Sequence, residues 1–171
     1  IKTYWGVSTT NPANTIRVTW TIFGFEAMII GDKGTMAVSP MYRVNRRYYQ
    51  AYYKRNLPRD AGFACHVQEN ATEVIDDRRN RAARPLGACG NLRIFRTAMA
   101  ASGQYSALVS PNNTKAEVLA EITNLMNAMN AVYERDLAVR MTLIANNDDI
   151  IYLNENTDPF TSNNLGTLID Q

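Results

Sequence analysis

The sequence predicts an α+β protein in which an antiparallel, β-rich N-terminal region precedes an incomplete α/β unit of strand, helix and strand. Three observations favour this class. Residues 15–22 alternate between apolar and polar side chains, residues 114–133 repeat apolar side chains every three or four positions, and a polar, charged stretch separates these two patterns. We therefore expect two parts, residues 1–85 and residues 86–171, with a linker at the end of the first part.

The composition is that of a folded globular protein. Hydrophobic residues make up 46% of the 171 residues and charged residues 20%, which excludes a disordered or fibrous chain. The net charge of +2 gives no electrostatic footprint for nucleic acid. No apolar run approaches the roughly 18–20 residues that a membrane span requires. The chain begins at Ile1 without a methionine or a signal peptide, a start typical of a fragment or a processed product.

Strand patterns dominate the first region. The period of two over residues 15–22 predicts a half-buried antiparallel strand, and the apolar segment that follows ends at Ile30. Gly31-Asp32-Lys33-Gly34 is a turn signal because glycine adopts positive φ without steric cost, so residues 35–38 are expected to close a hairpin. Residues 42–53 interleave tyrosines with arginines, which we interpret as a strand whose tyrosines cover a sheet rather than as a stacking platform for nucleic acid.

The second region follows a strand–helix–strand order. Residues 92–99 favour a strand, and Thr114 followed by Glu117 predicts a capping box, in which each side chain satisfies a helix N–H group that has no partner in the helix. Residues 137–145 resume strand character, so we expect a parallel pair. The apolar repeat of the helix is expected to form one face, comprising Val118, Ile122, Leu125, Met126, Met129, Val132 and Tyr133.

Several segments resemble a known family. They are residues 92–105 (LRIFRTAMAASGQY) and residues 130–146 (NAVYERDLAVRMTLIAN), continuing into DDIIY at residues 148–152 and TDPF at residues 157–160. These segments are similar to the first strand, first long helix and second strand of the catalytic domain in secreted, bacterial reprolysin-like zinc metallopeptidases, relatives of the adamalysins. Residues 52–58 (YYKRNLP) are similar to the end of the family's pro-region. The resemblance implies a metzincin-like fold, a propeptide as in a zymogen, a secreted or cell-surface location, and peptide-bond hydrolysis by a zinc-activated water.

The zinc-binding motif of such enzymes is absent from this sequence. They use His-Glu-x-x-His-x-x-Gly-x-x-His, whereas this chain has one histidine, His66. A catalytic zinc needs three protein ligands and an open position for water, so no catalytic or metal-binding residue is assigned here. The resemblance implies that the zinc helix follows Gln171. It also implies two partners, the remainder of the catalytic domain and a protein or peptide substrate.

Two cysteines leave several alternatives open. Cys89, in the segment RPLGACGN, resembles the cysteine with which related zymogens cover their catalytic zinc, and is therefore a candidate latency switch. A disulfide between Cys65 and Cys89 is a second alternative, and two cysteines without a special role are a third. The basic residues Arg81 and Arg84 form a candidate processing site, because an exposed basic linker suits a trypsin-like activator.

Two further expectations concern ligands and partners. Asp148, Asp149, Glu155 and Asp158 could supply oxygen ligands for calcium, although their spacing is not that of an EF-hand. An incomplete catalytic domain should expose a sheet edge and an apolar helix face, so oligomerisation or a tightly bound partner is expected. The alternative function is non-enzymatic: a β-rich binding or assembly module on a bacterial surface, with the tyrosine-rich strand as its contact face.

Overall fold

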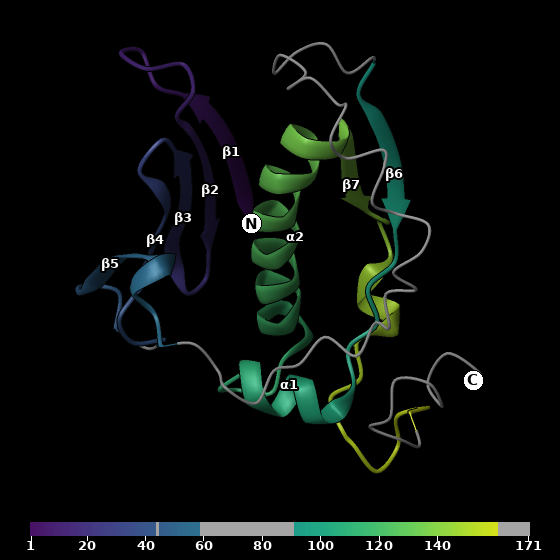
Figure 1. Ribbon diagram of the computed structural model, residues 1–171. Helices are drawn as coiled ribbons and strands as arrows, with labels where there is room; N and C mark the ends of the chain where they lie inside the picture. Colours follow the sequence, from purple (N-terminus) through teal and green to yellow (C-terminus); the bar gives the residue numbers. More distant parts are fainter. Residues whose placement is uncertain (44, 59–90, 161–171) are drawn as a thin grey trace, which may run out of the picture.

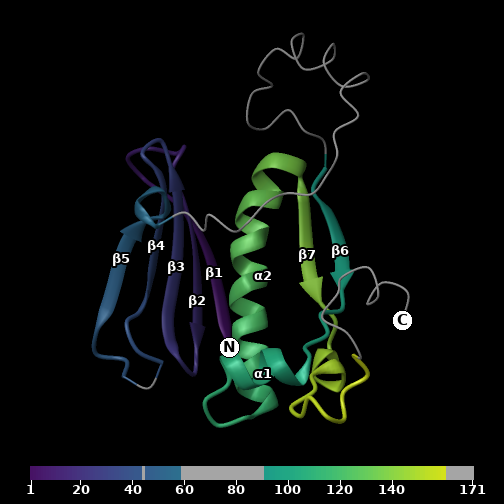
Figure 2. The same ribbon diagram turned by 60° about the horizontal axis from the view of Figure 1, so that its bottom comes forward.

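The computed structural model describes residues 1–43, 45–58 and 91–160 (Figure 1). A five-stranded antiparallel sheet follows chain order, with strands β1 (Lys2–Val7), β2 (Thr15–Thr21), β3 (Gly24–Gly31), β4 (Gly34–Pro40) and β5 (Tyr49–Tyr53). A second sheet is the parallel pair of β6 (Arg93–Thr97) and β7 (Val139–Leu143). Figure 2 shows the long helix α2 (Lys115–Leu137) standing between the two sheets. The α+β class and the parallel strand–helix–strand unit are thus confirmed, whereas the boundary predicted at residues 85–86 lies outside the described residues.

Short helical elements complete the fold. They are η1 (Lys54–Asn56), α1 (Gly103–Val109) and η2 (Asn147–Ile150). Helix α1, which the sequence patterns did not predict, packs closely on the C-terminal segment: a Cβ atom on Gly103 would lie 2.1 Å from the backbone nitrogen of Glu155. Neither of the two α-helices in the described part of the chain has the length and hydrophobicity of a membrane span.

The turn predicted at residues 31–34 is present. Gly31 pairs with Gly34 at the end of the β3–β4 hairpin, and Gly34 has a φ of 96°, which L side chains rarely adopt. The tyrosine-rich strand is shorter than predicted, because β5 first pairs with β4 at Pro40 and Tyr49. The residues before it form a loop that is closed by a hydrogen bond from the Met41 N–H to the Tyr48 carbonyl (2.9 Å).

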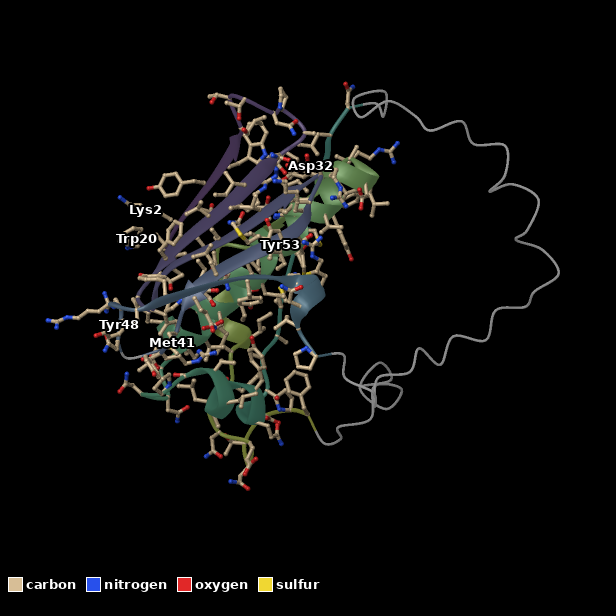
Figure 3. All side chains as sticks on the ribbon, turned by 60° about the vertical axis from the view of Figure 1, so that its left-hand side comes forward. Lys2, Trp20, Asp32, Met41, Tyr48 and Tyr53 are labelled. Atoms are coloured by element: carbon tan, nitrogen blue, oxygen red, sulfur yellow. The ribbon has the colours of Figure 1, made fainter. Side chains whose placement is uncertain are left out.

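Helix α2 covers the polar face of β2. Thr19 is 2% exposed and Thr21 5%, whereas Trp20 is 58% exposed. Residues paired across an antiparallel ladder share a face, so Trp20 lies with Lys2 and Phe25 on the side turned away from α2 (Figure 3). The alternation therefore predicts the strand correctly, but the apolar side of the sheet is the outer one.

The start of α2 confirms one half of the predicted capping box. The Thr114 hydroxyl accepts a hydrogen bond from the Glu117 N–H (3.3 Å). The prediction for the Glu117 side chain is wrong, because its carboxylate accepts from the Asn112 N–H (2.9 Å) and the Ser110 hydroxyl (2.5 Å). The Ser110 oxygen in turn accepts a hydrogen bond from the Thr114 N–H (2.8 Å). The Ser110 hydroxyl therefore lies between the Glu117 carboxylate and the Thr114 N–H, which bond directly in a capping box.

The apolar face of α2 is only partly buried. Val118, Ile122 and Met126 are 0%, 2% and 5% exposed, and the first two join a core cluster with Ala101, Val109 and Ile151. In contrast, Leu125 is 45% exposed and Val132 37%. The predicted seven-residue face is thus wrong for these two, since neither sheet reaches their side of the helix.

Two buried asparagines attach α2 to both sheets. The Asn127 side-chain amide donates to the Val18 carbonyl (3.0 Å) and the Thr19 hydroxyl (2.9 Å) of β2. The Asn130 amide donates to the Met141 carbonyl (2.8 Å) of β7 and accepts from the Met141 N–H (2.8 Å). Because one amide satisfies both backbone groups of a residue, Asn130 replaces a neighbouring strand at that point.

Replacing Asn130 should therefore destabilise the fold. We expect Asn130→Leu to lower the free energy of unfolding by about 2 kcal/mol, because both backbone groups of Met141 lose their partner. Urea denaturation followed by circular dichroism measures the change. Asn146→Leu, at an exposed position, is the control and should stay within about 0.5 kcal/mol of the unmodified chain. Equal losses for the two variants would contradict this role of Asn130.

Candidate functional site

Four of the site residues predicted from the sequence lie outside the described part of the chain. These are Cys65, Arg81, Arg84 and Cys89, all within residues 59–90. The latency switch, the disulfide and the processing site therefore stay predictions.

The predicted calcium ligands are not brought together. Asp148 and Asp149 belong to η2, whereas one Asp158 oxygen accepts from the Gly103 N–H (2.7 Å) and the other from the Phe160 N–H (3.0 Å). Within residues 1–43, 45–58 and 91–160, no group of three or more His, Cys, Asp or Glu residues is placed to hold a metal ion. Asp158 instead has a structural role, because it secures the start of α1 against the C-terminal segment.

A groove of about 500 Å³ is lined by β1 on one side, by β7 on the other side and by α2 between them. Thr3 and Trp5 come from β1, and Met141 and Leu143 come from β7. Both walls are terminal strands of their sheets in the described structure. The groove therefore joins residues that the sequence separates by more than a hundred positions.

A carboxylate held by two arginines lies in this groove. Arg140 of β7 donates to both oxygens of Glu134 of α2, from Nε (2.7 Å) and from a terminal nitrogen (3.1 Å). Arg17 of β2 donates to the same carboxylate. The side chains of Arg17 and Glu134 are 11% and 15% exposed, so water screens this pair poorly. Two guanidinium groups against one carboxylate leave the cluster with a net positive charge.

Burial and ion pairing act in opposite directions on Glu134. Burial disfavours the charged carboxylate, but the hydrogen bonds from Arg140 and Arg17 outweigh it, so the pKa of Glu134 is lowered. No local motif marks this cluster, because its three members come from three elements and each is an ordinary charged residue in the sequence. Sequence reasoning therefore missed it.

A second carboxylate, Glu26 of β3, lies between the antiparallel sheet and α2. Burial raises its pKa, and the negative charge of Glu121 raises it further, against lowering contributions from Asn124 and Arg43. Asn124 donates a hydrogen bond to Glu26. Arg43 bonds to Glu121 (2.7 Å) and to the Val109 carbonyl (2.6 Å). The sheet therefore meets the helix largely through polar contacts.

The outer face of the antiparallel sheet carries a separate hollow of about 450 Å³. Lys2, Trp20 and Arg46 line it. Trp20 continues into an edge-to-face row with Phe25 and Tyr49, with ring centroids 6.4 Å and 6.3 Å apart. This face carries the exposed aromatic residues that the alternative, non-enzymatic function would require.

The two carboxylates should affect the pH dependence of stability with opposite signs. Glu134 has a lowered pKa, so it stabilises the fold above its unfolded-state pKa and this contribution is lost as pH falls through the folded-state value. Glu134→Gln should therefore cost about 2 kcal/mol at pH 7 and progressively less in acid.

Glu26 has a raised pKa, so its ionised form opposes folding as pH rises through the raised value. The substitution Glu26→Gln removes this ionisable group. The stability of the variant relative to the unmodified chain should therefore be higher at pH 7 than at pH 4. Urea unfolding of both variants at several pH values tests the pair of predictions, and stability differences from the unmodified chain that change with pH in the same direction for both variants would contradict them.

Comparison with known proteins adds one match. The model of metallo-peptidase family M12B, reprolysin-like, matches residues 91–170, which contain β6, α1, α2 and β7. No curated protein and no solved structure matches the chain. The match coincides with the strand–helix–strand unit and leaves out the antiparallel sheet. Residues 91–170 of this chain are therefore similar to the reprolysin-like metallopeptidases of family M12B.

Proposed function

We propose that the chain is the N-terminal portion of a zinc-dependent endopeptidase, comprising a pro-region and the first part of the catalytic domain. The observation that carries this proposal is the unfinished sheet inside the matched residues. In the described structure β6 pairs with β7 alone, so its second edge has no partner strand. An open, apolar edge is a position where a further strand adds.

The faces of β6 support the same conclusion. Ile94 is 62% exposed and Phe95 52%. Successive residues of a strand point to opposite faces, so neither face of β6 is covered by the described residues. On α2, Leu125 and Val132 form an exposed apolar strip. We propose that the remainder of the catalytic domain packs on these surfaces and contains the zinc motif, following Gln171.

The residues of this chain do not fit a catalytic zinc. The sequence contains a single histidine, and the described residues hold no cluster of potential ligands. The proposed role of residues 91–170 is therefore structural: they supply two strands and the long helix on which the rest of the catalytic domain is built. Hydrolysis of protein or peptide substrates would belong to the complete enzyme.

The antiparallel sheet is the proposed pro-region. Its polar contacts with α2 are the Arg17–Glu134 pair, the Glu26–Asn124 hydrogen bond and the two bonds from Asn127. Polar groups regain hydrogen bonds to water when such an interface opens, so separation costs less than at an apolar interface of equal area. A sheet attached in this way suits a removable chaperone or inhibitor. Export to the cell surface or the medium is part of the same proposal.

The outer face of the sheet favours the second candidate, a non-enzymatic binding module. Trp20 and Tyr49 are 58% and 41% exposed there. This candidate requires neither a zinc motif nor a partner for β6. The following experiments separate the two functions.

The coding region after Gln171 provides the direct test. We expect it to encode a His-Glu-x-x-His-x-x-Gly-x-x-His segment, and the longer protein to bind zinc and cleave a casein substrate, with cleavage abolished by a chelator. The 171-residue chain is the matched control and should do neither. A coding region without the motif, or a longer protein that binds no zinc, would refute the proposal.

Truncating Phe95 tests the unfinished sheet independently of activity. In the 171-residue chain Phe95→Ala should change the free energy of unfolding by less than about 1 kcal/mol, because half of the ring is already in water. In the longer protein the same change should cost about 3 kcal/mol, because the ring would be buried there.

Tyr48→Ala is the control for Phe95→Ala, since Tyr48 is 59% exposed and lies outside the matched residues. Denaturant unfolding of both proteins measures the difference. A small cost for Phe95→Ala in the longer protein would show that nothing packs on β6.

A further inference from the structure

We infer that the groove between β1 and β7 binds an extended peptide segment that carries a carboxylate. The inference does not depend on the proposed function, because it is argued from the residues that line the groove and requires neither a zinc motif nor a completed catalytic domain. It rests on three features of the groove: its charge, the free edge of β1 and the exposed Trp5.

The charge of the groove favours an anionic ligand. Glu134 is the only carboxylate among the described residues that line it, and it faces both Arg17 and Arg140. Each guanidinium has five N–H donors, and a single carboxylate cannot use all of them. A second carboxylate could bond to Arg140, whose side chain is 41% exposed, and would bring the cluster to neutrality.

The free edge of β1 favours a peptide. Among the described residues β1 is the last strand of its sheet, so one row of its backbone groups has no partner strand there. An extended peptide that adds to this edge satisfies those groups along its length. The opposite wall is less suitable for strand addition, because Asn130 already occupies the Met141 backbone groups.

Trp5 supplies an apolar contact beside the arginines. It pairs with Arg17 in the β1–β2 ladder, which places both residues on the α2 side of the sheet. Its side chain is nevertheless 61% exposed, because α2 packs on β2 and β3 rather than on β1. A groove of about 500 Å³ lies within the range of about 300–1,000 Å³ that is typical of ligand sites. One net positive charge suits a peptide carboxylate better than a polyanion, which needs many cationic contacts.

Tryptophan fluorescence tests the inference, because the two tryptophans lie on opposite faces of the sheet. The probe is the blocked heptapeptide acetyl-TVTETVT-amide, titrated into the 171-residue chain. In Trp20→Phe, which retains Trp5, we expect a saturable change in emission. In Trp5→Phe, which retains Trp20, the peptide should leave the emission unchanged. A signal carried by Trp20, or no signal from Trp5 up to millimolar peptide, overturns the inference.

Modified peptides separate the two recognition elements without altering the protein. The analogue with glutamine in place of glutamate should bind about tenfold more weakly, because it loses a charge-assisted bond to the arginines. N-methylation at alternate residues should abolish binding by removing the donors that a sixth strand requires. Equal affinity of the glutamate and glutamine peptides, or full binding of the methylated peptide, overturns the inference.

A pair of protein variants locates the carboxylate. Arg140→Gln should weaken binding of the glutamate peptide about tenfold and leave the glutamine peptide unaffected. Arg135→Gln is the matched control, since Arg135 bonds to Asp136 and does not line the groove, and should change affinity by less than twofold. Circular dichroism checks that both variants fold. Equal effects of the two substitutions would show that the peptide carboxylate does not bind Arg140, and would refute the inference.

Discussion

The attachment of α2 to two sheets through side-chain amides is the interaction on which the rest of the structure depends. Asn127 binds the backbone of β2, and Asn130, on the next turn of the same helix, binds the backbone of β7. A buried amide without partners is costly, so each asparagine accepts few positions of the strand that it faces. These two side chains therefore specify how both sheets lie against the helix.

The polar attachment also explains why the antiparallel sheet turns its apolar side outward. Arg17, Thr19 and Glu26 point toward α2 and find charged or amide partners there. The alternate residues, among them Trp20, must then occupy the opposite face. Burial of apolar area contributes little where the sheet meets the helix, apart from Met28 and Ile30 against Ala131. Specific hydrogen bonds therefore set most of that contact.

The apolar surface is distributed differently in the part of the chain that matches the family model. The core around Val118, Ile122 and Ile151 lies within the residues that match the reprolysin-like metallopeptidases. The same residues leave Phe95 and Leu125 exposed. A well-formed core beside a strand that the described residues leave uncovered supports the proposal that the sheet continues in another part of the protein.

Local sequence patterns predicted several of the elements, although they missed α1 and made the tyrosine-rich strand longer than β5. The period of two over residues 15–22, the glycines at the residue 31–34 turn and Thr114 at the helix start each depend on the backbone geometry of neighbouring residues. The order of strand, helix and strand was enough to predict the parallel pairing of β6 with β7.

The tertiary structure alone decided which face of each element is covered and which charges meet. Arg17, Glu134 and Arg140 come from three elements, and Glu117 turns to Ser110 and Asn112 instead of completing its capping box. An alternating pattern shows that the two faces of a strand differ, but it does not show which face a helix will cover. The covered face is set by partner side chains more than a hundred residues away in the sequence, and a local pattern contains no information about them.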